Sequence, residues 1–180
     1  MMNPIEYKQL KAFAAMDGGL LGLIWITAMA CSVGQFKYES LSMVSMILMI
    51  GSLIFTVKRE RRFAREIRED KGFTFGQAWL YTILMVIFAS LLTAIAAYAY
   101  FAFLDHGFVS EGYTKFLGQP EVKKILTGLD KGSNLSDMIL QQIVIMHPID
   151  WAMNMLTTNI FVGMVFSPFI ALISRKKRSL

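Results

Sequence analysis

The sequence places several polar side chains inside long apolar runs, where such groups are unusual. Asp17 lies within the first run, and an ionisable residue inside a membrane span is by default a functional hypothesis because it is costly to bury there. Its position near one end of the run leaves a structural alternative, in which the carboxylate reaches water or pairs with a basic residue of another segment. Asn154 and Thr158 are four residues apart in the last run, so a helix presents them on one face. That face is expected to hydrogen-bond to a neighbouring helix or to line a water-filled pocket.

Two pairs of adjacent or nearby histidine and aspartate residues raise the question of a metal site. Asp105 and His106 follow the third apolar run, and His147 and Asp150 precede the fourth. Two imidazoles and two carboxylates are a possible zinc ligand set. Their spacing matches no metal motif, however, and the favoured interpretation is that these polar residues only terminate helices.

The sequence contains no motif that indicates catalysis. Met43, Met46 and Met49 share a helical stripe, and thioethers bind Cu(I), but apolar packing is the favoured interpretation. No Walker loop, nucleophile elbow, HExxH helix or dinucleotide fingerprint is present. We therefore expect a protein that is not an enzyme, with no catalytic residue, metal or cofactor.

Four apolar runs are long enough to position these residues in a membrane, where a helix needs about 20 apolar residues to cross. They span residues 13–34, 41–58, 78–104 and 151–173. The predicted fold is all-α: an integral membrane four-helix bundle forming a single domain over residues 1–180. Cys31 is the only cysteine, which excludes an intrachain disulfide. Cleavage of a lipoprotein signal before Cys31 is an alternative that the weak signal sequence disfavours.

The basic residues predict the orientation of the bundle. Of the 18 lysine and arginine residues, 13 fall on one side if there are four spans. By the positive-inside rule that side is cytoplasmic. We expect a multi-pass protein of the bacterial inner membrane with both termini in the cytoplasm, in contact with anionic lipids and not with nucleic acid.

The connection between the second and third spans, residues 58–77, carries most of these charges. Residues 58–71 are expected to be helical, ending at Gly72, with Arg62 opposite Glu66 and Arg65 opposite Glu69. One interpretation is a docking surface for a partner or for anionic lipid. The alternative, which the positive-inside rule favours, is a solvated continuation of the second span. The residues concerned are Arg59, Arg61, Arg62, Arg65 and Arg68.

The segment 105–150, expected outside the cytoplasm, is the one sizeable soluble part. Pro120 is expected to begin a helix that Gly128 ends. A second helix is expected from Asn134 or Ser136 to Met146. Both are too short to span, and we expect them to be interfacial, although a re-entrant segment or a lid is also compatible.

Small residues recur at four-residue spacing in three of the runs, which favours close helix packing within the bundle or against a partner helix. These stripes are Ala14, Gly18 and Gly22; Ala89, Thr93 and Ala97; and Gly163, Ser167 and Ala171.

The run REIREDKGFTFGQA, residues 65–78, follows the second span and opens the third. Together with a longer segment before the fourth span and the terminal basic run at 175–178, it resembles the domain-of-unknown-function family 4199, small four-helix inner-membrane proteins of Bacteroidetes. The resemblance covers nearly the whole chain and implies no catalytic residue. It implies a membrane partner role in envelope glycosylation, beside a polyprenyl-phosphate glycosyltransferase.

Two functional hypotheses follow. The first is a non-enzymatic accessory or scaffold protein that binds a membrane partner, such as that glycosyltransferase or a second copy of itself. The second is a small transporter or lipid-handling protein that uses Asp17 and the polar face of the fourth span. The second hypothesis requires a cavity between the first and fourth spans.

Overall fold

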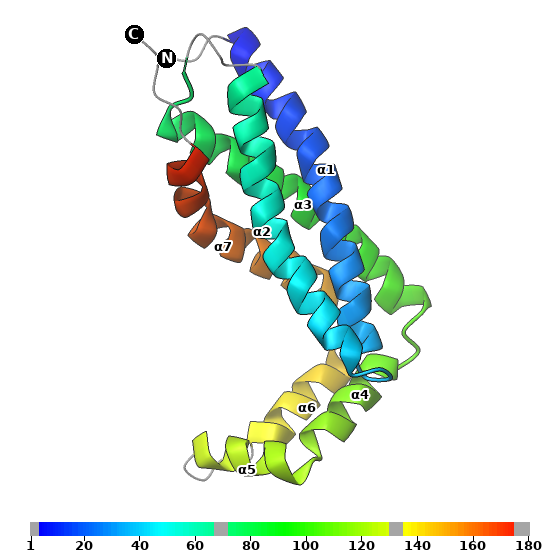
Figure 1. Cartoon of the computed structure of the whole chain (residues 1–180). Helices are drawn as coiled ribbons and strands as arrows, with labels where there is room; N and C mark the ends of the chain where they lie inside the picture. The colour runs from blue at the N-terminus through cyan, green and yellow to red at the C-terminus, as the bar shows by residue number, and fades with distance from the viewer. Residues whose placement is uncertain (1–3, 67–71, 130–134, 175–180) are drawn as a thin grey trace.

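The computed structural model describes residues 4–66, 72–129 and 135–174 of the chain, which are almost entirely helical (Figure 1). Four long helices are each long and apolar enough to cross a membrane. They are α1 (Pro4–Gly34), α2 (Ser40–Glu66), α3 (Phe75–Phe103) and α7 (Pro148–Ser174). The prediction of an all-α membrane bundle of four long helices is confirmed.

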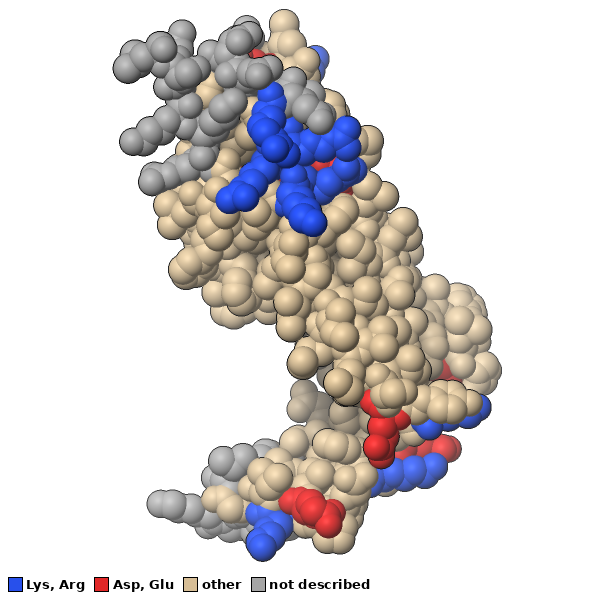
Figure 2. Space-filling view, viewed as in Figure 1, with Lys and Arg blue, Asp and Glu red and all other residues tan. Residues whose placement is uncertain are grey.

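The four helices alternate in direction and form a row. The central helix α3 packs on both α1 and α7, and α2 packs on the other side of α1. At one end of the bundle α1 begins and α7 finishes; we call this the basic end, because the exposed arginines of α2 gather there (Figures 1 and 2). At that end the Arg61 Nη2 donates a hydrogen bond to the Ile173 carbonyl oxygen at 3.2 Å, which joins α2 to α7.

The helix boundaries extend past the apolar runs. α1 begins at Pro4 rather than at residue 13, since Lys8 and Lys11 are good helix formers that continue the helix beyond its apolar part. α2 is one unbroken helix through the predicted second span and the first part of the basic connection. Before α3, the Thr74 N–H donates to Gln77 Oε1 at 3.2 Å, which caps the helix that the sequence placed after the glycine at 72.

Close packing between α1 and α3 depends on glycine. A Cβ atom on Gly18 would lie 2.6 Å from the Met85 carbonyl oxygen and 2.8 Å from the Phe88 Cβ. A Cβ on Gly163 of α7 would lie 2.3 Å from a Val86 methyl carbon. The predicted small-residue stripes therefore serve contacts inside the bundle, with α3 held closely on two sides.

The face that α2 buries is its polar one. Ser45, Ser52, Thr56 and Glu60 are buried, and Glu60 has no exposed surface at all. The apolar residues of α2 point outward instead. Met43, for example, is 67% exposed, so the apolar surface of the methionine stripe faces away from the other helices of the bundle. A bilayer is as apolar as a leucine side chain, so a membrane helix can turn its polar face inward and its apolar face to lipid.

At the other end of the bundle, α3 and α7 are joined by an arm of three helices: α4 (Phe108–Leu117), α5 (Pro120–Leu129) and α6 (Leu135–Ile145). The arm extends across the direction of the long helices, and we call this the arm end (Figure 1). The last two helices match the two that the sequence predicts between residues 120 and 146. α4 is not among the helices that the sequence predicts.

α4 docks on the short turn between α1 and α2. The Phe36 ring lies 5.1 Å from the Tyr113 ring and 6.4 Å from the Phe108 ring, measured between centroids. A Cβ on Gly112 would lie 2.4 Å from Phe36 Cγ, so the glycine provides the space for this ring. The arm is thereby fixed to the bundle by aromatic contacts at the root of α4.

Candidate functional site

An ion pair occupies the interior of the bundle near the basic end. Asp17 on α1 is buried, and its Oδ1 lies 2.7 Å from Nη2 of Arg59 on α2. The other carboxylate oxygen accepts a hydrogen bond from the Tyr81 hydroxyl of α3. The Arg59 guanidinium also lies 5.6 Å from the centre of the Phe55 ring. The structural alternative for Asp17, pairing with a basic residue of another segment, is the one the geometry adopts.

A second buried carboxyl lies beside the ion pair. Glu60 Oε2 accepts a hydrogen bond from the Thr82 hydroxyl at 3.0 Å. The neighbouring Phe63 ring stacks on Tyr81 at 4.9 Å and also contacts Phe73 at 5.7 Å. These rings close the polar cluster from the basic end. We refer to Asp17, Arg59, Glu60, Tyr81 and Thr82 as the charge cluster.

Between α2 and α7 the row of helices leaves a groove whose floor is α1 and α3. Nearer the arm end the groove contains a cavity of about 350 Å³. Its wall includes Trp25 and Ser32 of α1, Ser45 and Met49 of α2, Thr93 of α3, and Trp151, Asn154, Thr158 and Asn159 of α7. None of the residues that line this cavity is charged.

A second cavity of about 190 Å³ continues the groove toward the basic end. It shares Trp25 and Met49 with the first, and its other lining is mostly apolar, including Leu53, Val162 and Phe166. Thr56 lines its far end, one helical turn from Glu60 on the same face of α2. The groove therefore grades from uncharged walls that mix polar and apolar groups to almost wholly apolar walls, and it stops near the charge cluster.

The structure brings together two of the three intramembrane residues that the sequence singled out. The Thr158 hydroxyl donates to Asn154 Oδ1 at 3.2 Å, and both residues line the first cavity. Asp17 lines neither cavity. Asp17 instead forms its ion pair with Arg59, apart from the cavity that Asn154 and Thr158 line.

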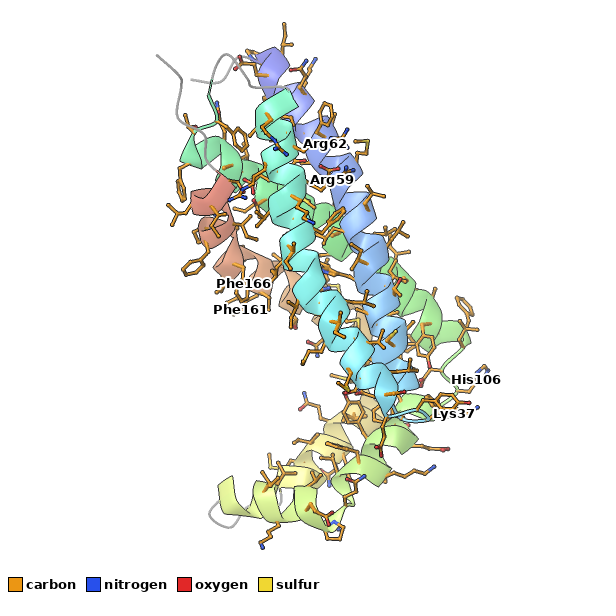
Figure 3. All side chains as sticks on the ribbon, viewed as in Figure 1. Lys37, Arg59, Arg62, His106, Phe161 and Phe166 are labelled. Carbon is orange, nitrogen blue, oxygen red and sulfur yellow. The ribbon has the colours of Figure 1, made fainter. Side chains whose placement is uncertain are left out.

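The predicted basic surface is present, but smaller than expected. Figure 2 shows the blue side chains gathered at the basic end of α2, and Figure 3 shows Arg59 and Arg62 close together there. Arg61, Arg62 and Arg65 are exposed, whereas Arg59 is mostly buried by its pairing with Asp17. Arg68 and the side chains of Glu66 and Glu69 lie outside the described part of the structure, as do the predicted charge pairs that involve them.

The histidine–aspartate pairs act at helix starts. Asp105 accepts hydrogen bonds from the backbone N–H groups of Gly107 and Val109, both at 3.1 Å, and so caps α4. Asp150 accepts from the His147 backbone N–H at 2.9 Å at the start of α7. Both carboxylates are thus employed as caps, which matches the favoured interpretation.

Sequence reasoning missed Glu60, Tyr81 and the wall residue Trp25. A signal for Glu60 was present: Ser45, Ser52, Thr56 and Glu60 recur at helical spacing through an otherwise apolar run. Glu60 falls within the predicted basic connection, residues 58–77, where the flanking arginines obscure this pattern. No sequence signal identifies Tyr81 as the partner of Asp17, since that contact depends on how α1 packs on α3.

Comparison with known proteins identifies a family. Residues 17–176 match the model of the family described as "Protein of unknown function (DUF4199)". No match was found among curated proteins or among solved structures. The chain belongs to this family of unknown function, as the resemblance in the sequence implies.

Proposed function

We propose that this member of the DUF4199 family is a lipid-handling membrane protein that binds an amphiphilic lipid in the groove between α2 and α7. One observation carries the proposal. Two adjoining cavities open between these helices, and their walls change along the groove from a mixture of polar and apolar groups to almost wholly apolar groups. A lipid has the same gradient from head to tail.

The dimensions of the groove fit this use. Small-molecule sites commonly measure about 300–1,000 Å³, and the polar cavity of about 350 Å³ falls in that range. The apolar cavity of about 190 Å³ adds a narrower extension suited to a hydrocarbon chain. This version of lipid handling needs no role for Asp17, which remains in its ion pair.

The proposed location is the inner membrane of a bacterium, with the basic end at the cytoplasmic surface. Supporting it, 13 of the 18 lysine and arginine residues belong to segments on the basic side of the four spans. The polar cavity then lies in the half of the bilayer away from the cytoplasm. A lipid would enter sideways from that leaflet.

A substitution that fills the groove with a larger side chain tests the proposal. Val162 lines the apolar cavity, whereas its neighbour Phe161 does not. Val162→Trp should fill the cavity, and Phe161→Trp is the matched control on the exposed face. Native mass spectrometry of detergent-purified protein should show a retained lipid of discrete mass in the wild type and the control, and lose it in Val162→Trp. Equal retention in all three would overturn the proposal.

A second candidate function is a non-enzymatic accessory protein for a membrane partner, for example a polyprenyl-phosphate glycosyltransferase or a second copy of the chain. The exposed basic residues Arg61, Arg62 and Arg65 favour it, since they form a charged surface where α2 reaches the membrane boundary (Figure 2). Anionic lipid headgroups would also bind to this basic surface.

Charge reversal distinguishes partner binding from lipid contact. Arg62→Glu/Arg65→Glu should abolish co-purification of a stoichiometric partner in mild detergent, while Lys115→Glu/Lys124→Glu on the arm should not. A chain that elutes alone in every case would eliminate this candidate. Loss of binding to vesicles containing anionic lipid, without loss of any protein, would assign the surface to lipid.

A further inference from the structure

The polar cavity holds hydrogen-bonding groups that the described part of the protein leaves unused. Asn154 accepts from Thr158 through Oδ1, but its amide nitrogen has no partner there, and neither amide atom of Asn159 has one. The serine hydroxyls of the wall are satisfied: Ser45 Oγ donates to the Ala28 carbonyl at 3.0 Å and lies 2.6 Å from Ser32 Oγ. The unused amide groups of the cavity therefore belong to two residues of α7.

Asn159 lies well inside the span, and Asn154 lies one helical turn from its end. At a rise of about 1.5 Å per residue, Asn154 lies about 4.5 Å and Asn159 about 12 Å along α7 from residue 151, where the predicted span begins. Polar groups at such depth are costly unless they find partners, because hydrocarbon offers none. Trp25 is a third residue with an unused hydrogen-bonding group. Its indole N–H is buried in the wall that the two cavities share, and no acceptor for it lies among the described residues.

The absence of charged residues from the wall restricts the kind of ligand further. No lysine, arginine, aspartate or glutamate lines the polar cavity, and the exposed arginines of α2 lie at the opposite end of the bundle. A phosphate or carboxylate in this cavity would be a buried charge without a counter-ion, which is unfavourable even after the surroundings relax. An uncharged group that both donates and accepts hydrogen bonds matches a pair of amides.

From these observations, and resting on the proposed lipid-binding function, we infer that the groove is selective for a neutral lipid with hydroxyl and ester carbonyl groups, such as an acylglycerol. The head hydrogen-bonds to Asn154 and Asn159, and the acyl chain lies along the apolar cavity lined by Leu53, Val162 and Phe166. An uncharged head can leave the membrane surface at lower cost than a phosphate, which suits the depth of the two amides.

Two probes with the same chain and different heads test the inference. Delipidated full-length protein is titrated with 1-oleoyl-glycerol and with 1-oleoyl-lysophosphatidic acid, and the dissociation constants are measured by native mass spectrometry. The neutral probe should bind at least about tenfold more tightly. The reason is that the phosphate of the other probe would place at least one polar oxygen in the cavity without a partner, and one such group lowers affinity by about tenfold or more. Equal or tighter binding of the phosphate-bearing probe would overturn the inference.

Variants assign the selectivity to the two amides. Asn154→Leu/Asn159→Leu should weaken binding of 1-oleoyl-glycerol by about tenfold or more. The matched control is Thr157→Val, because the Thr157 hydroxyl bonds to the Met153 carbonyl and does not line the cavity. If the double variant fails to fold, the milder single changes Asn154→Ser and Asn159→Ser replace it, and wild-type affinity in both would contradict the inference.

The design separates this inference from the function on which it rests. Val162→Trp should abolish binding of both probes if the groove holds the chain. Wild-type binding of both probes by Val162→Trp refutes the groove as a lipid site. Loss of both probes in Val162→Trp, with no head-group preference in the wild type, refutes only the neutral-head inference.

Discussion

At the scale of single residues, the charge cluster shows how the protein holds ionisable groups inside an apolar bundle. The Asp17 carboxylate of α1 pairs with Arg59 of α2 and accepts a hydrogen bond from the Tyr81 hydroxyl of α3, so three helices meet at one side chain. Removing one member of a buried pair leaves the other charge uncompensated, which is more damaging than removing both.

A double-mutant cycle should reveal this coupling. We expect Asp17→Asn to lower the free energy of unfolding by up to about 3 kcal/mol, since Arg59 retains a route to the surface that softens the loss. Arg59→Gln in the same chain should restore part of the stability. Unfolding in a detergent titration measures each step. If Asp17→Asn alone is as stable as the wild type, the pair is not a structural element.

At the scale of helices, the row α2–α1–α3–α7 depends on where small residues allow backbones to approach. Gly18 and Gly19 are adjacent on α1 but face differently. An added Cβ at Gly18 would strike the α3 backbone, whereas at Gly19 it would meet nothing within 4 Å. The two positions therefore offer a matched comparison of packing against helix propensity.

We expect Gly18→Ala to destabilise the protein by about 1–3 kcal/mol, because α1 must shift away from α3. Gly19→Ala should be neutral or stabilising by up to about 1 kcal/mol, since alanine is the better helix former. Thermal unfolding in detergent measures both. Equal effects at the two positions would show that α1 and α3 are not in close contact.

The arm offers a second prediction at this scale. Gly112→Ala should displace the Phe36 ring and release α4 from the turn between α1 and α2. Gly128, which has nothing within 4 Å of an added Cβ, provides the control Gly128→Ala on α5. Faster backbone hydrogen exchange over residues 108–117 in Gly112→Ala, but not in Gly128→Ala, is the expected result. Unchanged exchange in both would mean that Phe36 does not anchor the arm.

At the scale of the whole molecule, charge and hydropathy together define the orientation that we propose. The apolar middle of the bundle separates the basic end from the arm (Figure 2). Figure 3 places Lys37 and His106 together at the arm end, far from Arg59 and Arg62. The expected topology has the basic end in the cytoplasm and the arm on the other side.

Cysteine labelling tests that topology, and the chain is well suited to it because Cys31 is its only cysteine. In a Cys31→Ser background, Lys124→Cys on the arm should react with an impermeant maleimide in spheroplasts. Lys8→Cys at the basic end should react only after the membrane is opened. The reverse pattern would invert the proposed orientation.

The sequence was sufficient to predict features that depend on a single helix. Run length predicted the four long helices, and four-residue spacing predicted that Asn154 and Thr158 act together. Features that depend on two helices were not predictable. The choice of Arg59 for Asp17 and the cavities beside α7 both follow from how the helices pack, which no local pattern encodes. α4 escaped prediction because its start depends on an Asp105 cap and on contact with Phe36.

The bond between Arg61 and the Ile173 carbonyl has a mechanical consequence. It joins α2 to α7 at the basic end, whereas the cavity beside Asn154 separates the same two helices nearer the arm end. We therefore expect the distance between α2 and α7 to fluctuate more beside Asn154, where a molecule would enter, than beside the charge cluster.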